Sequence, residues 1–393
     1  MKITVETDHK DNVWLVGSTL HGVVKVTVDK PTKLHSIVVH ITGKGMTGNY
    51  KIREQWFGAN EDYIDETIKI FGDDIEEYVT HSEGDYSYPF SVQLGADMPS
   101  SYEGELGFVR YTLKVSITKP YHDKKLKIPL TFIRHLACNE YADAMNPIVE
   151  SVDKKVEGLC FCKCSEEGSM TVKLHVNKTA FVPGEPLIYE ISVDNRSVNV
   201  IRHISFILRQ NIVFTGFHNH QPANTPHFRT WKTKFKLCEF ENDFKILANQ
   251  GKTFNGAATI PAIPPTGLPG CNIIDIKYLV ILLVDNSFTH VKFKKEVFIG
   301  TIPTTEESRS PAPLTTDDNA LCTNDTGFAL QPTVPLALPP SYAQCVFGKV
   351  DLKEDDDKDT TSYSNWAPSY TYYDWSQTTN YGGMAPITVT PDK

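Results

Sequence analysis

The sequence lacks any long hydrophobic run, since none approaches the roughly 20 apolar residues that a transmembrane helix needs. The most apolar stretch, YLVILLV at 278–284, has the length of a buried strand. The first ten residues, MKITVETDHK, also lack the apolar region of a secretory signal. We therefore expect a cytoplasmic chain that neither spans a membrane nor is exported.

Signatures of catalysis, metal binding and cofactor binding are also lacking, so we expect no enzyme and no cofactor. The run CFCKC (Cys160, Cys162, Cys164) has no second cysteine pair at zinc-finger spacing. It predicts small apolar side chains on one strand face, with metal binding or lipidation as the alternatives. The histidines of GFHNHQPANTPHF (216–228) lie in a Pro- and Asn-rich segment that is typical of a loop.

Net charge is small in the body of the chain and concentrated near its end. The chain has a formal charge of −9, and residues 302–393 hold 13 acidic and 5 basic residues, so eight of the nine charges lie there. A body that is almost neutral argues against nucleic-acid binding. The last 92 residues are rich in Thr, Ser, Pro and Asp, and we expect a disordered tail.

Period-two alternation is the main structural signal in residues 1–301. In GFVRYTLKVSI (107–117), apolar residues alternate with polar or charged ones, and SMTVKLHV (169–176) and KLHSIVVHI (33–41) behave similarly. Such alternation predicts half-buried strands of antiparallel sheets, and no long amphipathic helix stands out. The pattern is typical of β-sandwiches.

A weak internal repeat indicates two such sandwiches. Val16 corresponds to Val182 and Pro99 to Pro265 at an offset of 166, and Tyr111 corresponds to Tyr278 at an offset of 167. We therefore predict one sandwich over residues 1–150, a second over residues 151–301 and the tail over residues 302–393.

Three segments resemble the α-arrestins, the family of arrestin domain-containing proteins. They are YPFSVQLGADMPSSYEGELGFVRYTLKVSI (88–117), AFVPGEPLIYEISVDNRS (180–197) and VFIGTIP (297–303). The resemblance implies the arrestin fold, an all-β arrangement of two tandem immunoglobulin-like β-sandwiches, without a catalytic centre.

The tail carries a Pro-Pro-x-Tyr motif at Pro339, Pro340, Ser341 and Tyr342. Adjacent prolines pre-order a polyproline II segment, which the aromatic grooves of WW domains bind. The alternative is a chance Pro-Pro in a proline-rich tail. The resemblance implies that the motif recruits WW-domain HECT-type ubiquitin ligases.

A second, weaker WW motif is predicted at Pro368 and Tyr370, where Ala367 replaces the first proline. Its alternative is an aromatic-rich disordered stretch.

Two further features are candidate sites. The first is a basic cluster of four lysines, Lys119, Lys124, Lys125 and Lys127. It is a candidate surface for acidic or phosphorylated cargo tails, or for peripheral membrane contact. The alternative is an ordinary solvated loop. The second is Cys238, a candidate redox thiol because lysines flank it; the alternative is a reduced bystander.

The function that the resemblance implies is that of an adaptor. It would link the cytoplasmic tails of transmembrane receptors or transporters to a ubiquitin ligase at the plasma membrane and endosomes, promoting ubiquitination, endocytosis and sorting. One alternative is a regulatory binding protein similar to the thioredoxin-interacting branch, which sequesters partners. Another is a retromer-type arrestin relative, against which the tail argues.

Overall fold

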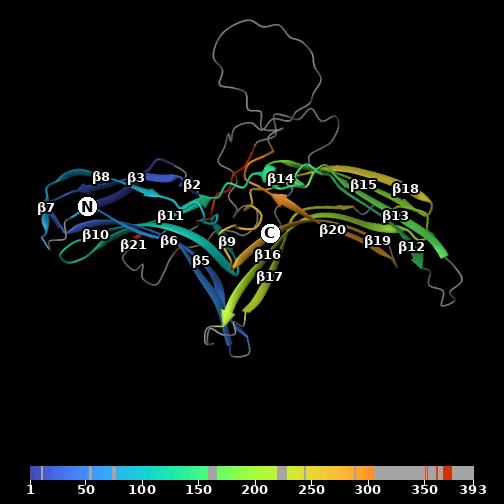
Figure 1. Ribbon diagram of the computed structural model, residues 1–393, viewed down its shortest axis with the longest axis horizontal. Coiled ribbons are helices and arrows are strands. Elements are labelled where there is room, and N and C mark those ends of the chain that lie inside the picture. Colours follow the sequence, from blue (N-terminus) through green and yellow to red (C-terminus); the bar gives the residue numbers. More distant parts are fainter. Residues whose placement is uncertain are drawn as a thin grey trace, which may run out of the picture.

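The computed structural model describes residues 1–9, 12–52, 55–72, 77–157, 166–218, 228–242, 245–286, 289–304, 350, 352, 360–361 and 366–373 (Figure 1). Almost all of their regular structure is β-strand. Helical structure in these ranges is confined to one 3-10 turn, η1 (Cys138–Glu140). None of their helices has the length and hydrophobicity needed to cross a membrane.

The N-terminal sandwich has a three-stranded sheet in the order β1-β3-β8, which faces the sheet portion β6-β5-β10-β11-β2. Strands β4 and β7 pair separately at its far end, and β9 pairs with β10. The strands are β1 (Lys2–Thr7), β2 (Val13–Leu15), β3 (Thr19–Val28), β4 (Thr32–Leu34), β5 (Ser36–Ile52), β6 (Gln55–Phe71), β7 (Val79–His81), β8 (Gly84–Gln93), β9 (Tyr102–Gly104), β10 (Gly107–Thr118) and β11 (Lys124–Ile133).

The C-terminal sandwich repeats this plan. Its four-stranded sheet has the order β12-β13-β15-β18, and the portion β14-β20-β19-β16 faces it, with β17 paired to β16. The strands are β12 (Ile148–Glu157), β13 (Glu166–Val176), β14 (Ala180–Phe181), β15 (Pro186–Asn195), β16 (Ile201–His218), β17 (Phe228–Asn242), β18 (Gln250–Thr259), β19 (Ile274–Asn286) and β20 (His290–Ile299).

Strand β10 shows how the sequence pattern produces the sandwich. Its side chains alternate between buried and half-buried along the whole strand. Leu113 on its inner face lies opposite Ile41 of β5 and Ile128 of β11. The alternation predicted for GFVRYTLKVSI is therefore confirmed, because one face of the strand packs into the core while the other is partly hydrated.

The internal repeat is visible in one buried tyrosine of each sandwich. Tyr111 on β10 donates a hydrogen bond to the carbonyl oxygen of Pro99 at 2.7 Å. Tyr278 on β19 donates to the carbonyl oxygen of Pro264 at 2.6 Å and accepts a bond from Gln210 Nε2 at 2.9 Å. Both tyrosines are fully buried and lie on equivalent strands, so the predicted correspondence between them is structural.

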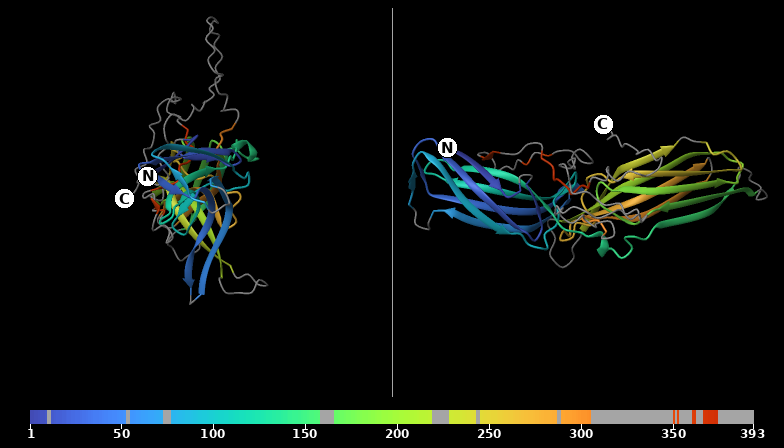
Figure 2. Two further views of the ribbon diagram at one scale, coloured as in Figure 1. Left: turned by 90° about the vertical axis from the view of Figure 1, so that its left-hand side faces the viewer. Right: turned by 90° about the horizontal axis from the view of Figure 1, so that it is seen from above.

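The two sandwiches lie end to end (Figure 2, right), and the pairing of β6 with β16 joins them in one sheet. The long hairpins β5–β6 and β16–β17 meet beneath the junction (Figure 1), where Phe217 pairs with Gly58. Thr47 donates a side-chain hydrogen bond to the carbonyl oxygen of Thr215 at 2.8 Å. The ring centroids of Tyr102 and Phe214 lie 6.3 Å apart, and one apolar cluster runs through both sandwiches.

The predicted fold class is confirmed for the described residues: they form two tandem sandwiches made almost entirely of strands. Most of the predicted tail, including residues 305–349, lies outside the described residues. The short strand β21 (Thr360–Thr361) and residues 366–373 are described, and they pack on the sandwiches.

A buried ion pair lies beside the junction. Glu103 on β9 is 1% exposed, and Arg110 on β10 contacts both carboxylate oxygens, with Nη2 2.9 Å from Oε2. The guanidinium also lies 3.7 Å above the Phe108 ring. Burial raises the pKa of Glu103, and the hydrogen bond and charge of Arg110 offset this only in part.

Replacing Arg110 should expose the cost of that burial. We expect Arg110→Met to lower the free energy of unfolding by about 3 kcal/mol, because it leaves a buried carboxylate without its cation. Glu103→Gln in the same chain should restore most of the loss. As the matched control, Lys25→Met removes the exposed ion pair with Glu6 and should cost less than about 1 kcal/mol.

The same variant should also depend on pH. Because the folded-state pKa of Glu103 is raised, protonation favours the fold, and loss of Arg110 raises that pKa further. The penalty of Arg110→Met should therefore shrink as pH falls from about 7.5 to about 5, measured by urea unfolding against the unsubstituted chain. A penalty that grows on acidification would contradict this assignment.

The two buried tyrosines allow a second comparison. Tyr278→Phe removes two hydrogen bonds and should lower the free energy of unfolding by about 2 kcal/mol, whereas Tyr111→Phe removes one and should cost about 1 kcal/mol. Both changes leave the ring in place, so urea unfolding reports the hydroxyl alone. Equal losses would show that the bond from Gln210 adds nothing.

Candidate functional site

The intact Pro-Pro-x-Tyr motif, Pro339, Pro340, Ser341 and Tyr342, lies outside the described residues. Its binding to a WW domain therefore stays a prediction from the sequence. The cysteines of CFCKC and the histidines His220 and His227 also lie outside them. In the part of the chain that the structure describes, no group of three or more His, Cys, Asp or Glu residues has the geometry to hold a metal ion.

The weaker second motif is described, and it is buried. Tyr370 is 2% exposed and belongs to the apolar cluster shared by the sandwiches. Its hydroxyl donates a hydrogen bond to the carbonyl oxygen of Ser101 at 3.0 Å, and Ser369 N lies 3.4 Å from Thr131 Oγ1. Pro368 is buried as well. A WW domain needs the proline and tyrosine rings exposed, so it cannot bind the segment in this position.

Tyr373 anchors the same segment to the second sandwich. Its backbone N–H donates to the carbonyl oxygen of Pro183 at 3.0 Å, and its hydroxyl donates to the carbonyl oxygen of Thr301 at 2.8 Å. Burial, and secondarily the Cys138 thiol, raises the pKa of Tyr373 to about 12, so the phenol keeps its proton at neutral pH. Its ring packs against a small cluster that includes Ala180 and Val182.

Other described parts of the tail lie along the N-terminal sandwich. Thr360 and Thr361 of β21 pair in parallel with Lys125 and Leu126 of β11. Val350 and Trp366 exchange two backbone hydrogen bonds of 2.8 and 2.9 Å. Leu352 is 5% exposed. Composition alone did not predict these contacts.

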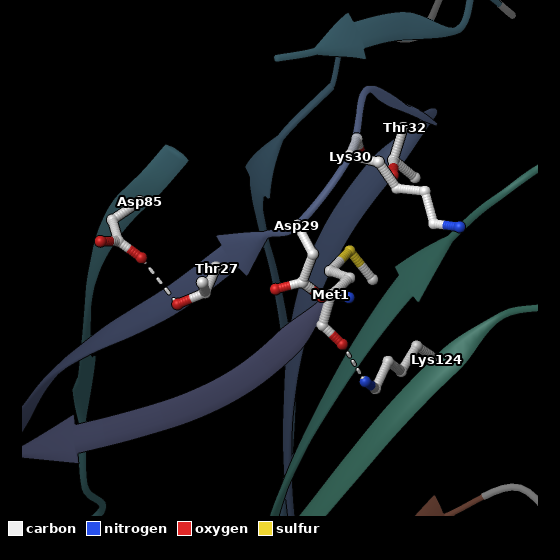
Figure 3. A network of polar contacts seen from close by, with 7 residues as sticks. All are labelled: Met1, Thr27, Asp29, Lys30, Thr32, Asp85 and Lys124. Carbon is white, nitrogen blue, oxygen red and sulfur yellow. Dashed lines mark hydrogen bonds and ion pairs between the residues drawn. The ribbon is translucent and has the colours of Figure 1, made fainter. Parts of the chain in front are cut away.

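The four lysines of the basic cluster do not form one open surface. Lys124 Nζ donates to the carbonyl oxygen of Met1, whose ammonium pairs with Asp29 (Figure 3). That ammonium, through its hydrogen bond and charge, lowers the pKa of the Asp29 carboxyl. Lys124 is thus part of a network that fixes the start of β1 against the β3–β4 turn and β11.

The other three lysines are divided between strand and loop. Lys119 and Lys125 are half-buried, whereas Lys127 is 6% exposed. Lys127, Leu352 and Arg110 help to line a cavity of about 350 Å³ on the outward face of the sheet portion that contains β10 and β11. Lys119 and Lys125 therefore keep more access to solvent than Lys127, and the predicted cargo surface stays a prediction.

The candidate redox residue Cys238 lies in the core. It is 5% exposed on β17, and its Sγ donates a weak hydrogen bond to the carbonyl oxygen of Thr259 at 3.4 Å. A mixed disulfide requires a thiolate that a partner can reach, so this position fits the alternative of a reduced bystander. Cys138, Cys238 and Cys271, the cysteines in the described ranges, are all free thiols.

Family models agree with the architecture. The arrestin (or S-antigen) N-terminal domain matches residues 3–139, and the arrestin (or S-antigen) C-terminal domain matches residues 166–304. The two matches together cover most of the chain, one for each sandwich.

Relatives of this chain carry the name arrestin domain-containing protein. The rat (Rattus norvegicus) arrestin domain-containing protein 1 is 22% identical over 381 residues, covering 96% of this chain and 79% of the relative. The human (Homo sapiens) protein of that name is 23% identical over 339 residues, covering 86% and 70%. Arrestin domain-containing protein 17 of Caenorhabditis elegans is 22% identical over 321 residues, covering 75% and 69%. With both domain models matched in order on two sandwiches of the expected topology, the chain belongs to the α-arrestins, the arrestin domain-containing branch of the arrestin family.

Proposed function

We propose that this chain is a non-catalytic adaptor that brings a WW-domain HECT-type ubiquitin ligase to membrane-protein cargo. The observation that carries the proposal is the intact motif Pro339-Pro340-Ser341-Tyr342, placed after two arrestin domains. The sandwiches would bind the cytoplasmic tail of a receptor or transporter at the plasma membrane or on endosomes. The ligase would then ubiquitinate the cargo, which promotes its endocytosis and sorting.

The physical basis for ligase binding is the pre-ordering of the motif. Pro339 and Pro340 fix their φ angles near the polyproline II value, so little conformational entropy is lost on docking. The Tyr342 ring then fills an aromatic-lined pocket, as hot-spot aromatic residues do in other interfaces. The second motif lacks the first proline and is buried in the described structure, so we assign ligase binding to the first motif alone.

Cargo binding has a weaker structural basis. The half-buried Lys119 and Lys125 offer charge to an acidic or phosphorylated tail, or to an anionic membrane surface. Lys124 bonds to Met1, and Lys127 lines a cavity. Both lie on β11 beside Lys125, so their charges would add to the attraction of an acidic ligand. The buried Cys238 favours the adaptor over the alternative of partner sequestration through a thiol.

Tyr342→Ala should weaken binding of the full chain to a purified WW domain at least about 30-fold, since loss of an interface hot spot costs about 2 kcal/mol or more. Ser341→Ala is the matched control and should bind like the unsubstituted chain, because the variable position contributes little to the grooves. The dissociation constants are measured by isothermal titration calorimetry. Unchanged affinity in Tyr342→Ala would exclude this motif as the ligase site.

The same variant separates ligase recruitment from cargo binding in cells. Tyr342→Ala should reduce ubiquitin on cargo that co-purifies with the chain, without reducing the amount of cargo recovered. The substitution is preferable to deletion of the tail because residues 366–373 contact both sandwiches. Cargo ubiquitination that is unaffected by the substitution would contradict the adaptor mechanism.

A further inference from the structure

We propose that the junction of the two sandwiches is a peptide-binding site and that residues 366–373 of the tail are its ligand in cis. In the docked state the second Pro-Ser-Tyr motif is withheld from WW domains and the two sandwiches are clamped together. Release of the segment would expose both the motif and the junction. The proposal does not depend on ligase recruitment through Pro339–Tyr342.

The docked segment contacts both sandwiches within a few residues. Ser369 and Tyr370 bond to residues of the N-terminal sandwich, and Tyr373 bonds to residues of the C-terminal one. In Figure 2 (right), one red stretch of the tail lies over the place where the sandwiches meet, and another, β21, lies over the N-terminal sandwich. The segment therefore acts across the junction, and its release would remove direct links between the domains.

The N-terminal side of the site is made by Ser100 and Ser101. Both side chains are fully buried, and Ser101 Oγ accepts a hydrogen bond from Phe132 N at 2.9 Å. Ser100 Oγ accepts one from Arg134 N at 2.9 Å. These bonds fix the chain before β9 against β11, which leaves the Ser101 carbonyl oxygen directed at the Tyr370 hydroxyl. The acceptor is thus held by the sandwich itself and does not depend on the tail for its position.

The C-terminal side is a turn that fits closely around the segment. Gly184 has a φ of +92°, and a Cβ at this position would collide with the carbonyl oxygen of Tyr373. Beneath the turn, Glu185 accepts a hydrogen bond from Val182 N at 3.0 Å and forms a buried ion pair with Lys178. The glycine allows the tail backbone to approach, and the ion pair holds the turn in shape.

The burial of β11 indicates which part of the sheet the tail helps to cover. On β10 the outer-face residues are half-buried, as expected for a hydrated face. On β11 every residue from Lys127 to Ile133 is buried on both faces. Thr131 on the outer face contacts Ser369, and Lys127 shares a cavity with Leu352, so described residues of the tail account for part of this cover.

Covalent attachment allows a modest contact to be occupied and still be displaced. A ligand tethered to its own site has an effective concentration in the millimolar range, so intrinsic affinity in the micromolar range suffices for nearly full occupancy. A competing peptide or partner in trans can then displace it at accessible concentrations. The aromatic content of the segment, with the buried Tyr370 and the half-buried Tyr373, supplies the contact area for such an affinity.

Hydrogen exchange on the full chain tests the site. We expect amides of residues 366–373, above all that of Tyr373, to exchange at least about tenfold more slowly than in an isolated peptide of the same sequence. Tyr370→Ala should abolish this protection. The matched control is Tyr121→Ala, which replaces a tyrosine that is 91% exposed and should leave the protection unchanged. Exchange of residues 366–373 at the peptide rate in the unsubstituted chain would overturn the proposal.

A competition experiment guards against misfolding of the variant. A synthetic peptide of residues 364–375, added in excess to the unsubstituted full chain, should accelerate exchange of the chain's own residues 366–373. The same peptide with Tyr370 and Tyr373 replaced by Ala should not. Acceleration by both peptides, or by neither, would overturn the proposal. None of these exchange measurements involves a WW domain, so failure of this proposal is distinct from failure of ligase recruitment through Tyr342.

Discussion

Burial of alternate apolar side chains between facing sheets is the interaction on which the rest of this molecule depends. It aligns β10 with β5 and β11 and places Tyr111 and Tyr278 at equivalent points of the two sandwiches. It also leaves the outer faces and the junction to be completed by polar groups. Three sets of polar contacts depend on the strand positions that this burial determines. They are the Thr47 bond to Thr215, the buried pair of Glu103 and Arg110, and the contacts of the tail.

The junction combines two segments by which the sequence resembles its family. Ser100 and Ser101 precede β9, and Gly184 and Glu185 lie in the turn after β14; both segments meet residues 366–373. Their proximity gives these residues a role that goes beyond turn formation. In one sandwich a carbonyl oxygen is offered to the tail, and in the other a glycine makes room for its backbone. The tail is therefore recognised mainly by backbone groups, which limits how far side-chain changes on the sandwiches alone can alter binding.

The sequence predicted the strands, the tandem repeat and the family, because these depend on local alternation and on segments that are contiguous in the chain. It did not predict the docked tail, since Tyr370 and Ser101 are 269 residues apart and the tail as a whole is rich in Thr, Ser, Pro and Asp. The aromatic run YTYY at 370–373 was the one available signal of burial. The contacts of the lysines could not be predicted either. Lys124 bonds to Met1, which is 123 residues away in the sequence, and Lys127 shares a cavity with Leu352 of the tail.

The pairing of β21 with β11 has a consequence for self-association of the protein in solution. Strand β2 pairs with β11 only at Thr131–Ile133, so at Lys125 and Leu126 it is β21 that occupies the free edge. A chain cleaved before Thr360 would present unpaired backbone groups there, which another chain can extend as a sheet. The lysines along this edge oppose such growth by charge repulsion. We therefore expect Lys124 and Lys125, which lie on this edge, to limit self-association of a chain that has lost the tail.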